Sequence, residues 1–348
     1  MNLHHDHEAF SELIAAASNE LRIPPGIIEK DYYVTLALRE PASRVKGMVF
    51  KGGTSLTKCY QILDRFSEDI DISYAAEEGV PGESRKRQLK KAVVSSIETI
   101  GFSVTNLEET RSRRSYNCYR ASYPSIYSSL LELKPELVIE TYIALLPFPT
   151  VSRMADNYIY RFLKMTEQED LAEEFGLMPF EITTQAIERT LIDKVFAICD
   201  YYLSNKVEQH SRHLYDIYKI MEYTMPDISL SELVQEVRNL REPLTVCPSA
   251  KTGVCINDIL AEIVDKKIYR NDYETITRRF LFTYLPYEVA IDGIKEIINR
   301  GYFGMPKKND KPNQQDKILG ADIAVKEYLP IGRNEVPSHR NRFSEQAF

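Results

Sequence analysis

Residues 45–74, VKGMVFKGGTSLTKCYQILDRFSEDIDISY, decide the fold of this 348-residue chain. The apolar run at 45–50 predicts a short buried strand, because it is bounded by residues typical of turns. Gly52 and Gly53 follow it and predict a tight turn, since glycine adopts backbone conformations that side chains disfavour. The stretch therefore begins as strand and turn.

A helix is expected directly after this turn. Thr54 or Ser55 suits its N-cap, and Leu56 begins its apolar face. The free backbone N–H groups and the positive end of the helix dipole would then face any ligand over the turn, and phosphate is the natural ligand. Arg65 and Ser67 further along either hold the turn or contact a phosphate.

Acidic and apolar residues alternate at Asp69-Ile70-Asp71-Ile72, as in a strand with one face in the core. Asp69 and Asp71 are two residues apart, so both carboxylates leave the strand on the same face. Two neighbouring carboxylates repel each other unless a divalent cation lies between them, and carboxylate with phosphate oxygen is the ligand set of magnesium. The sequence thus predicts a metal-dependent nucleotide site.

Two motifs, GGTSLTKCY at 52–60 and RFSEDIDIS at 65–73, resemble the first two motifs of the AbiEii-type nucleotidyltransferase toxins. This family is a branch of the DNA-polymerase-β-like superfamily. The two motifs occur in order and one helix apart, which makes the pair more specific than either alone. The resemblance implies nucleotide contacts at Gly52, Gly53, Thr54, Ser55, Lys58, Arg65, Ser67 and Asp216.

A third carboxylate completes the metal site in polymerase-β-like folds and comes from a later strand. Glu140, in the strand expected at 137–144, is the best-placed residue, with Glu132 and Glu136 as competitors. The resemblance therefore implies that Asp69, Asp71 and Glu140 hold Mg²⁺ or Mn²⁺ and take part in catalysis.

The segment AIERTLIDKVFAIC at 186–199 also resembles the family and carries Lys194 where a helix lysine faces the nucleotide. Beside a buried stripe, this lysine can extend to the domain cleft and neutralise triphosphate charge during catalysis. The alternative is an exposed helix lysine that pairs with Asp193 or Glu188.

A later motif, SRHLYDIY at 211–218, supplies Arg212 and Asp216. Contact of Asp216 with the nucleotide and an ion-pair network that joins two domains are equally good explanations of this motif. The segment Glu29-Lys30-Asp31 resembles the family's N-terminal helix motif, and it is equally explained by ion pairs one helical turn apart.

The remaining pattern predicts an α/β (α+β) fold with a mixed sheet, followed by a helical second domain. Further strands are expected at 102–107, 115–123, 137–144 and 158–164. Helices are expected at 10–21, 83–100, 184–204 and several later segments. We expect a nucleotidyltransferase domain at 1–170, a helical domain at 171–300 and a polar extension at 301–348.

The formal net charge of −7 argues against a passive coat for nucleic acid. Two basic clusters stand out, SRKRQLKK at 84–91 and RSRR at 111–114. The alternatives are a local basic groove and, for each cluster alone, a solvated face. No apolar run approaches the roughly 20 residues that span a bilayer, and no signal peptide is evident. Five scattered cysteines indicate reduced thiols and a cytoplasmic protein.

The resemblance implies a transfer of a nucleotide from a nucleoside triphosphate to an acceptor, with RNA such as tRNA as the expected acceptor. It also implies the toxin of a bacterial toxin–antitoxin or abortive-infection pair, used in phage defence. A cognate antitoxin is expected without a stable complex, and the toxin itself as a monomer. The alternatives are a phosphotransferase that uses a nucleoside triphosphate and a nucleotide-binding regulator without catalysis.

Overall fold

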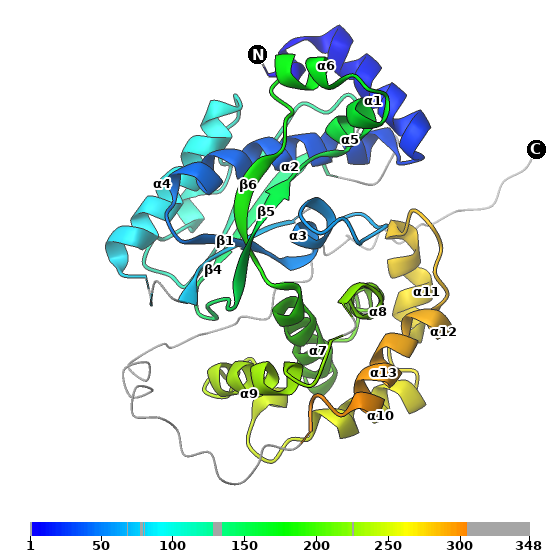
Figure 1. Cartoon of the computed structure of the whole chain (residues 1–348). Coiled ribbons are helices and arrows are strands. Elements are labelled where there is room, and N and C mark those ends of the chain that lie inside the picture. Colours follow the sequence, from blue (N-terminus) through cyan, green and yellow to red (C-terminus); the bar gives the residue numbers. More distant parts are fainter. Residues whose placement is uncertain are drawn as a thin grey trace, which may run out of the picture. The chain divides into compact units, whose positions relative to one another are not determined.

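The computed structural model describes residues 2–67, 69–76, 79, 81–127, 134–224 and 226–304. All of them belong to one compact unit, Met1–Pro306. A six-stranded mixed sheet forms its centre, in the order β3-β4-β2-β1-β6-β5 (Figure 1). The strands are β1 (Met48–Lys51), β2 (Asp69–Tyr74), β3 (Tyr116–Ser122), β4 (Glu136–Tyr142), β5 (Thr150–Ala155) and β6 (Phe180–Gln185).

The strands β1 and β2 are antiparallel, and β2 and β4 are parallel. The side chains of each strand alternate between the two faces of the sheet, because a strand has a period of two residues. On one face Ile70, Ile72 and Ile139 are fully or almost fully buried, while the other face carries the partly exposed acids. The predicted acidic strand is therefore a central strand with one face in the core.

Helices before β6 cover the apolar face and the ends of the sheet. They are α1 (His7–Leu21), α2 (Pro25–Arg44), α3 (Gly52–Lys58), α4 (Glu83–Thr99), α5 (Tyr158–Met165) and α6 (Glu169–Glu174). The helix α2 is the most deeply buried of these, and α1, α4 and α5 pack against it. The sheet is thus held on this face by a layer of helices.

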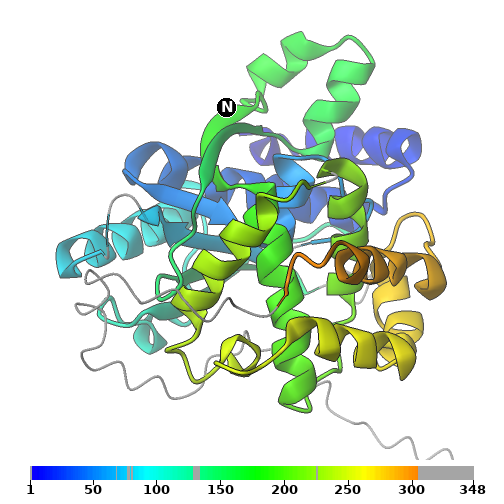
Figure 2. The same ribbon diagram turned by 60° about the horizontal axis from the view of Figure 1, so that its bottom comes forward.

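Helices after β6 pack mainly on one another and lie below the sheet in Figure 1. They are α7 (Ile187–Leu203), α8 (Arg212–Thr224), α9 (Leu230–Arg241), α10 (Ile256–Asp265), α11 (Arg270–Thr275), α12 (Tyr287–Ala290) and α13 (Asp292–Arg300). Close approach of α13 to α8 depends on Gly293, because a Cβ there would lie 2.8 Å from the Tyr218 α carbon. Figure 2 shows the long α7 crossing this group.

The predicted fold class, α/β (α+β) with a mixed sheet followed by helices, is confirmed. The sheet continues to Gln185 through β6, which lies after residue 170; the division into two domains stays a prediction. No helix among the described residues is long and apolar enough to cross a membrane.

Two predicted strands were wrong. Residues 158–164 form α5, because the Asn157 side chain accepts from Tyr160 N at 2.8 Å and so caps a helix. Residues 102–107 lead instead into the short 3₁₀ helix η3 (Leu107–Glu109). The expected helix 184–204 also begins later, since its first two residues end β6.

Candidate active site

Three strands bring a cation and two carboxylates into one row across the sheet. Lys51 on β1 is the register partner of Asp71 on β2, and Asp71 is the register partner of Glu140 on β4. Register partners leave neighbouring strands on the same face, so the three side chains point the same way. Asp69 lies two residues before Asp71 and joins that face from the adjacent row. We call Lys51, Asp69, Asp71 and Glu140 the charged face.

The carboxyl of Asp71 is the electrostatic centre of the charged face. Burial, together with the nearby Glu140 and Asp69, raises its pKa to about 7. Lys51 and Lys194 oppose this rise. Mutual repulsion of this kind is what a bound divalent cation relieves.

The glycine turn meets the charged face at Gly52. Gly52 has φ +78°, and a Cβ added there would lie 2.0 Å from Asp71 Oδ2. The carboxylate of Asp71 therefore occupies the space that any side chain at residue 52 would need. Strand, turn and acid are thus one closely packed unit.

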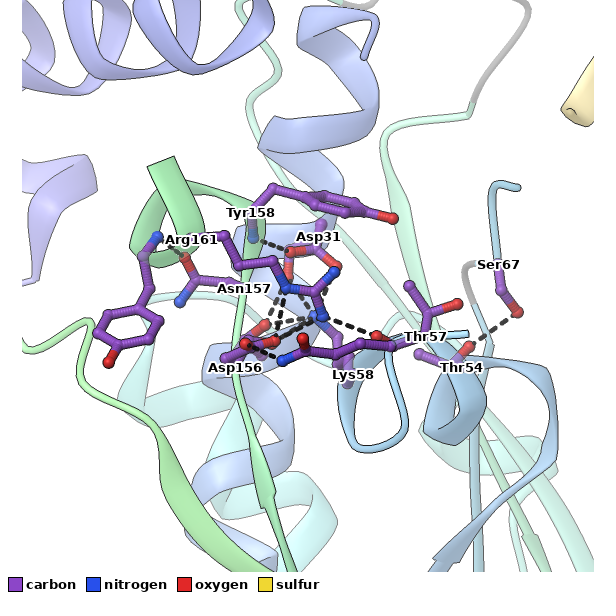
Figure 3. Close-up of polar contacts among 12 residues, drawn as sticks. Asp31, Thr54, Thr57, Lys58, Ser67, Asp156, Asn157, Tyr158 and Arg161 are labelled. Atoms are coloured by element: carbon purple, nitrogen blue, oxygen red, sulfur yellow. Dashed lines mark hydrogen bonds and ion pairs between the residues drawn. The ribbon is translucent and has the colours of Figure 1, made fainter. Parts of the chain in front are cut away.

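Gly53 allows a second close contact, with the side chains of Arg65 and Ser67. A Cβ there would lie 2.7 Å from Arg65 Nη2 and 2.8 Å from Ser67 Oγ. The Ser67 hydroxyl is also 3.0 Å from Thr54 Oγ1, and Thr54 is buried (Figure 3). Ser67 therefore holds the turn through Thr54, and Arg65 packs closely against Gly53. Contact of either residue with a phosphate stays a prediction.

The predicted N-cap at Thr54 or Ser55 was wrong. The helix α3 begins at Gly52, with Lys51 at the N-cap position and no side-chain cap. Ser55 is fully buried, and its hydroxyl donates to Gly52 O at 2.9 Å within the first turn. The two glycines let the helix begin earlier than a capping side chain would indicate.

Arg65, Asp216 and Lys194 form a buried ion cluster beside this turn. Arg65 donates from Nε and Nη2 to the two oxygens of Asp216 at 2.6 and 2.7 Å, and Lys194 Nζ donates to Asp216 Oδ2 at 2.5 Å. Asp216 is fully buried. Although burial raises the pKa of Asp216, Arg65 and Lys194 together hold it below its usual value.

This cluster joins the segment between α3 and β2, which carries Arg65, to the helices α7 and α8. The motif at 211–218 thus takes part in an ion-pair network, with Arg65 rather than Arg212 as the arginine. Contact of Asp216 with the nucleotide stays a prediction. The alternative of an exposed Lys194 was wrong, because its side chain is only 8% exposed. Lys194 nevertheless lies close enough to lower the pKa of Asp71, so its predicted catalytic role stays a prediction.

Lys58 is separate from the charged face. Its ammonium donates to Asp31 Oδ1 at 2.6 Å and to Thr35 Oγ1 at 2.5 Å, and it is 1% exposed. Asp31 Oδ2 in turn accepts from Tyr158 N at 2.9 Å, which ties α2, α3 and α5 together (Figure 3). This pair gives Lys58 a structural task, and its predicted nucleotide contact stays a prediction.

The segment Glu29-Lys30-Asp31 makes contacts with distant parts of the chain, and Asp31 pairs with Lys58, 27 residues away. Glu29 accepts from Ser125 Oγ at 2.5 Å and Ile126 N at 2.9 Å, and Lys30 donates to Lys134 O at 3.0 Å. All three side chains are buried in α2, so their partners come from distant segments.

Sequence reasoning missed two residues at the charged face. The Lys51 ammonium lies over the Tyr142 ring, 5.3 Å from its centroid, and makes no ion pair with another described residue. Burial lowers its pKa, while Asp71 opposes that change. The Tyr116 hydroxyl donates to Glu140 Oε1 at 3.0 Å and so orients the third carboxylate. The sequence held a signal for Lys51 alone, which directly precedes Gly52.

Among the described residues, no group of three or more His, Cys, Asp or Glu side chains is arranged to hold a metal ion. Mg²⁺ commonly takes one or two carboxylates and completes its shell with water and substrate phosphate. The pair Asp71 and Glu140, with a raised Asp71 pKa, suits that ligand set. The charged face therefore fits the ligand set of a divalent cation such as Mg²⁺.

The family model described as nucleotidyl transferase AbiEii toxin, type IV toxin–antitoxin system, matches residues 37–293. Among solved structures, the chain is similar to MenT4, a nucleotidyltransferase toxin from Mycobacterium tuberculosis H37Rv, with 17% identity and a TM-score of 0.39. That similarity covers 83% of this chain and 88% of MenT4. No curated protein matches the sequence.

Proposed function

Since the chain belongs to the AbiEii family of nucleotidyltransferase toxins of type IV toxin–antitoxin systems, we propose that it transfers a nucleotide from a nucleoside triphosphate to RNA. An acceptor hydroxyl attacks the α-phosphorus, the bond between the α-phosphorus and its bridging oxygen breaks, and pyrophosphate leaves. The hydroxyl proton passes to a carboxylate of the charged face or to water. The observation that carries the proposal is the row of Lys51, Asp71 and Glu140 against the Gly52 turn.

Asp69, Asp71 and Glu140 would hold Mg²⁺ or Mn²⁺, which when bound neutralises phosphate charge and polarises the reacting phosphate. Their positions are fixed by the strands β2 and β4 rather than by loops. Tyr116 keeps Glu140 oriented through its hydroxyl. The protein therefore presents its acids from rigid backbone, which lowers the cost of reorganisation during reaction.

Lys51 is the cation that we propose to bind the triphosphate. Lys58 and Lys194 are each held by a buried carboxylate, whereas Lys51 lies in the row of acids without such a partner among the described residues. An ammonium in this position can bind phosphate oxygens without breaking an ion pair. Lys194 and Arg65 contribute positive field from behind the turn.

We propose a monomer that works in the cytoplasm, with a cognate antitoxin that does not form a stable complex. The large exposed apolar side chains of the described chain, such as Met154, Leu203 and Ile228, are spread over different elements. This scattered distribution supports the absence of an obligate partner. Phage defence by abortive infection would follow from growth arrest by the active toxin.

Labelled triphosphates test the reaction directly. The protein is incubated with Mg²⁺, total RNA, lysate protein and a nucleoside triphosphate labelled at the α- or the γ-phosphate. We expect the α-label on RNA and none with Asp71→Asn. Retention of the γ-label would identify a phosphotransferase, and nucleotide binding without retention of either label would identify a regulator.

A further inference from the structure

The two basic clusters of the sequence come together in the structure. Lys90 on α4 donates from Nζ to Thr110 O at 3.0 Å, and Arg113 lies 3.5 Å from Glu83 at the start of α4. We define the basic surface as residues 83–91 and 106–114. These contain eight lysines and arginines and three glutamates, a net charge of +5 in a chain of net charge −7. Charge of one sign is therefore concentrated here against the overall balance.

Many of these cations face solvent on a fixed backbone. Arg87, Lys91, Arg111, Arg113 and Arg114 are exposed. The guanidinium of Arg114 donates to a backbone carbonyl, Glu109 O at 3.1 Å, so this contact leaves its charge uncompensated. Four exposed cations on other elements, Lys266, Arg270, Lys295 and Arg300, each pair with a carboxylate, as Arg113 does with Glu83.

The basic surface is attached to the edge of the charged face. Asn106 donates to Cys118 O at 2.9 Å, and Arg111 N donates to Asn117 Oδ1 at 2.7 Å, so the loop runs along the edge strand β3. Cys118 is the register partner of Glu140. Arg114 precedes Tyr116 by two residues, about 7 Å of extended chain. The cations thus begin two residues before Tyr116, whose hydroxyl donates to Glu140.

Two aromatic rings lie between the basic surface and the acids. Tyr116 and Tyr142 are register partners, their ring centroids are 6.5 Å apart, and both are partly exposed. Rings of this kind stack on unpaired bases, while lysine and arginine bind the phosphate backbone. A ribose hydroxyl at a strand end is also the kind of acceptor that nucleotide transfer requires.

We propose that the basic surface on α4 and the loop before β3 binds the phosphate backbone of the RNA acceptor and leads its single-stranded end across Tyr116 and Tyr142 to Glu140. This inference rests on the proposed function, since it concerns the acceptor of the same site. Figure 2 shows α4, in cyan, away from the yellow and orange helices, so the RNA body would lie at the end of the molecule that carries α4.

The test compares three forms of the full chain by fluorescence anisotropy with a labelled RNA hairpin that has a single-stranded 3′ end. The basic-surface variant carries Arg87→Gln, Lys91→Gln, Arg111→Gln and Arg114→Gln. The control variant has the same change in net charge through Lys266→Gln, Arg270→Gln, Lys295→Gln and Arg300→Gln. Polyglutamate is the competing polyanion, and urea unfolding verifies that all three forms are folded.

We expect the basic-surface variant to bind the hairpin at least about tenfold more weakly than wild type. The slope of log affinity against log salt should fall by about 1 for each phosphate that the variant no longer binds. The control variant should stay within about twofold, because each of its cations was already neutralised. Equal affinity of the two variants, or no binding by wild type, would overturn the inference. Competition by polyglutamate as strong as by unlabelled RNA would also overturn it, in favour of an acidic protein.

Nucleotide binding and label transfer separate this inference from the proposed function. The basic-surface variant should bind the nucleoside triphosphate as wild type does, since its substitutions lie outside the charged face. Hairpin binding that depends on the basic surface, in a protein that transfers no label, would support the inference and reject the transferase. Undiminished transfer to RNA by the basic-surface variant would do the reverse.

Discussion

The Asp71 carboxylate lies against the α carbon of Gly52, so that a Cβ at residue 52 would be 2.0 Å from Asp71 Oδ2. This contact connects the glycine turn, the acidic strand and the start of α3. It explains why the two motifs belong together: the turn must carry no side chain where the acid lies.

Gly52→Ala should abolish nucleotide transfer and lower the free energy of unfolding. A residue with φ +78° loses roughly 1–2 kcal/mol when it gains a Cβ, and the clash with Asp71 adds to that. Gly101→Ala is the matched control, because Gly101 has φ +87° and nothing within 4 Å of the added Cβ. Urea unfolding and label transfer measure both variants. Equal losses of stability would mean that the contact with Asp71 does not matter.

Asp71→Asn should abolish transfer while the fold remains intact. Burial and the nearby Glu140 raise the Asp71 pKa to about 7, so removal of this acid relieves repulsion in the free protein. We expect an unfolding free energy equal to wild type or slightly higher at pH 8. Expression from one promoter at matched protein levels adds a cellular readout: wild type should slow growth and the variant should not. Equal growth inhibition by both would reject an enzymatic toxin.

Substitutions of two lysines should differ in their effects on nucleotide binding and on stability. Lys51→Met should weaken triphosphate affinity by about tenfold or more, because the variant has no ammonium to bind a phosphate oxygen in this buried site, with little change in unfolding. Lys58→Met should cost about 3–5 kcal/mol of stability, because it leaves the buried Asp31 carboxylate without its cation. Calorimetry and urea unfolding on both variants test this difference. A stable Lys58→Met protein with weakened nucleotide binding would instead support the contact predicted from the motif.

Asp216→Asn should destabilise the protein by about 3–5 kcal/mol, since Arg65 and Lys194 would remain buried without their carboxylate. Asp292→Asn is the control, because its partner Lys295 is exposed and such pairs contribute about 1 kcal/mol or less. Chemical denaturation of both variants gives the comparison. A loss below about 1 kcal/mol for Asp216→Asn would mean that the ion cluster does not hold the helices to the turn.

The sequence predicted what depends on local pattern. Alternation identified β2 and β4, and the glycine pair identified the turn before α3. It did not predict the partners of buried charges, because these depend on tertiary packing: Arg65 and Asp216 are 151 residues apart. Lysines on helices look alike in sequence whether they bind a ligand or a buried acid. Lys51 was missed for the opposite reason, since it stands at a strand end with no helical or motif pattern of its own.

Acid should destabilise the protein through His210. Its ring stacks on Tyr201 with centroids 3.4 Å apart, and its buried Nδ1 has no hydrogen-bond partner among the described residues. Burial, with the nearby Arg212, lowers the His210 pKa from 6.5 to about 4. The unfolded chain therefore binds more protons than the folded chain between these two values. Stability from this group is complete above pH 6.5 and is lost as pH falls toward 4.

His210→Phe should keep the stacked ring and remove the titration. We expect wild type to lose about 1–2 kcal/mol more than the variant when urea unfolding is compared at pH 6.5 and pH 4.5, because one proton changes the free energy by at most about 1.4 kcal/mol per pH unit. Measurements at pH 7.5 and 8.5 provide the baseline, where both proteins should respond to pH alike. Parallel curves for the two proteins down to pH 4.5 would show that His210 accepts its proton in the folded state as readily as in the unfolded chain.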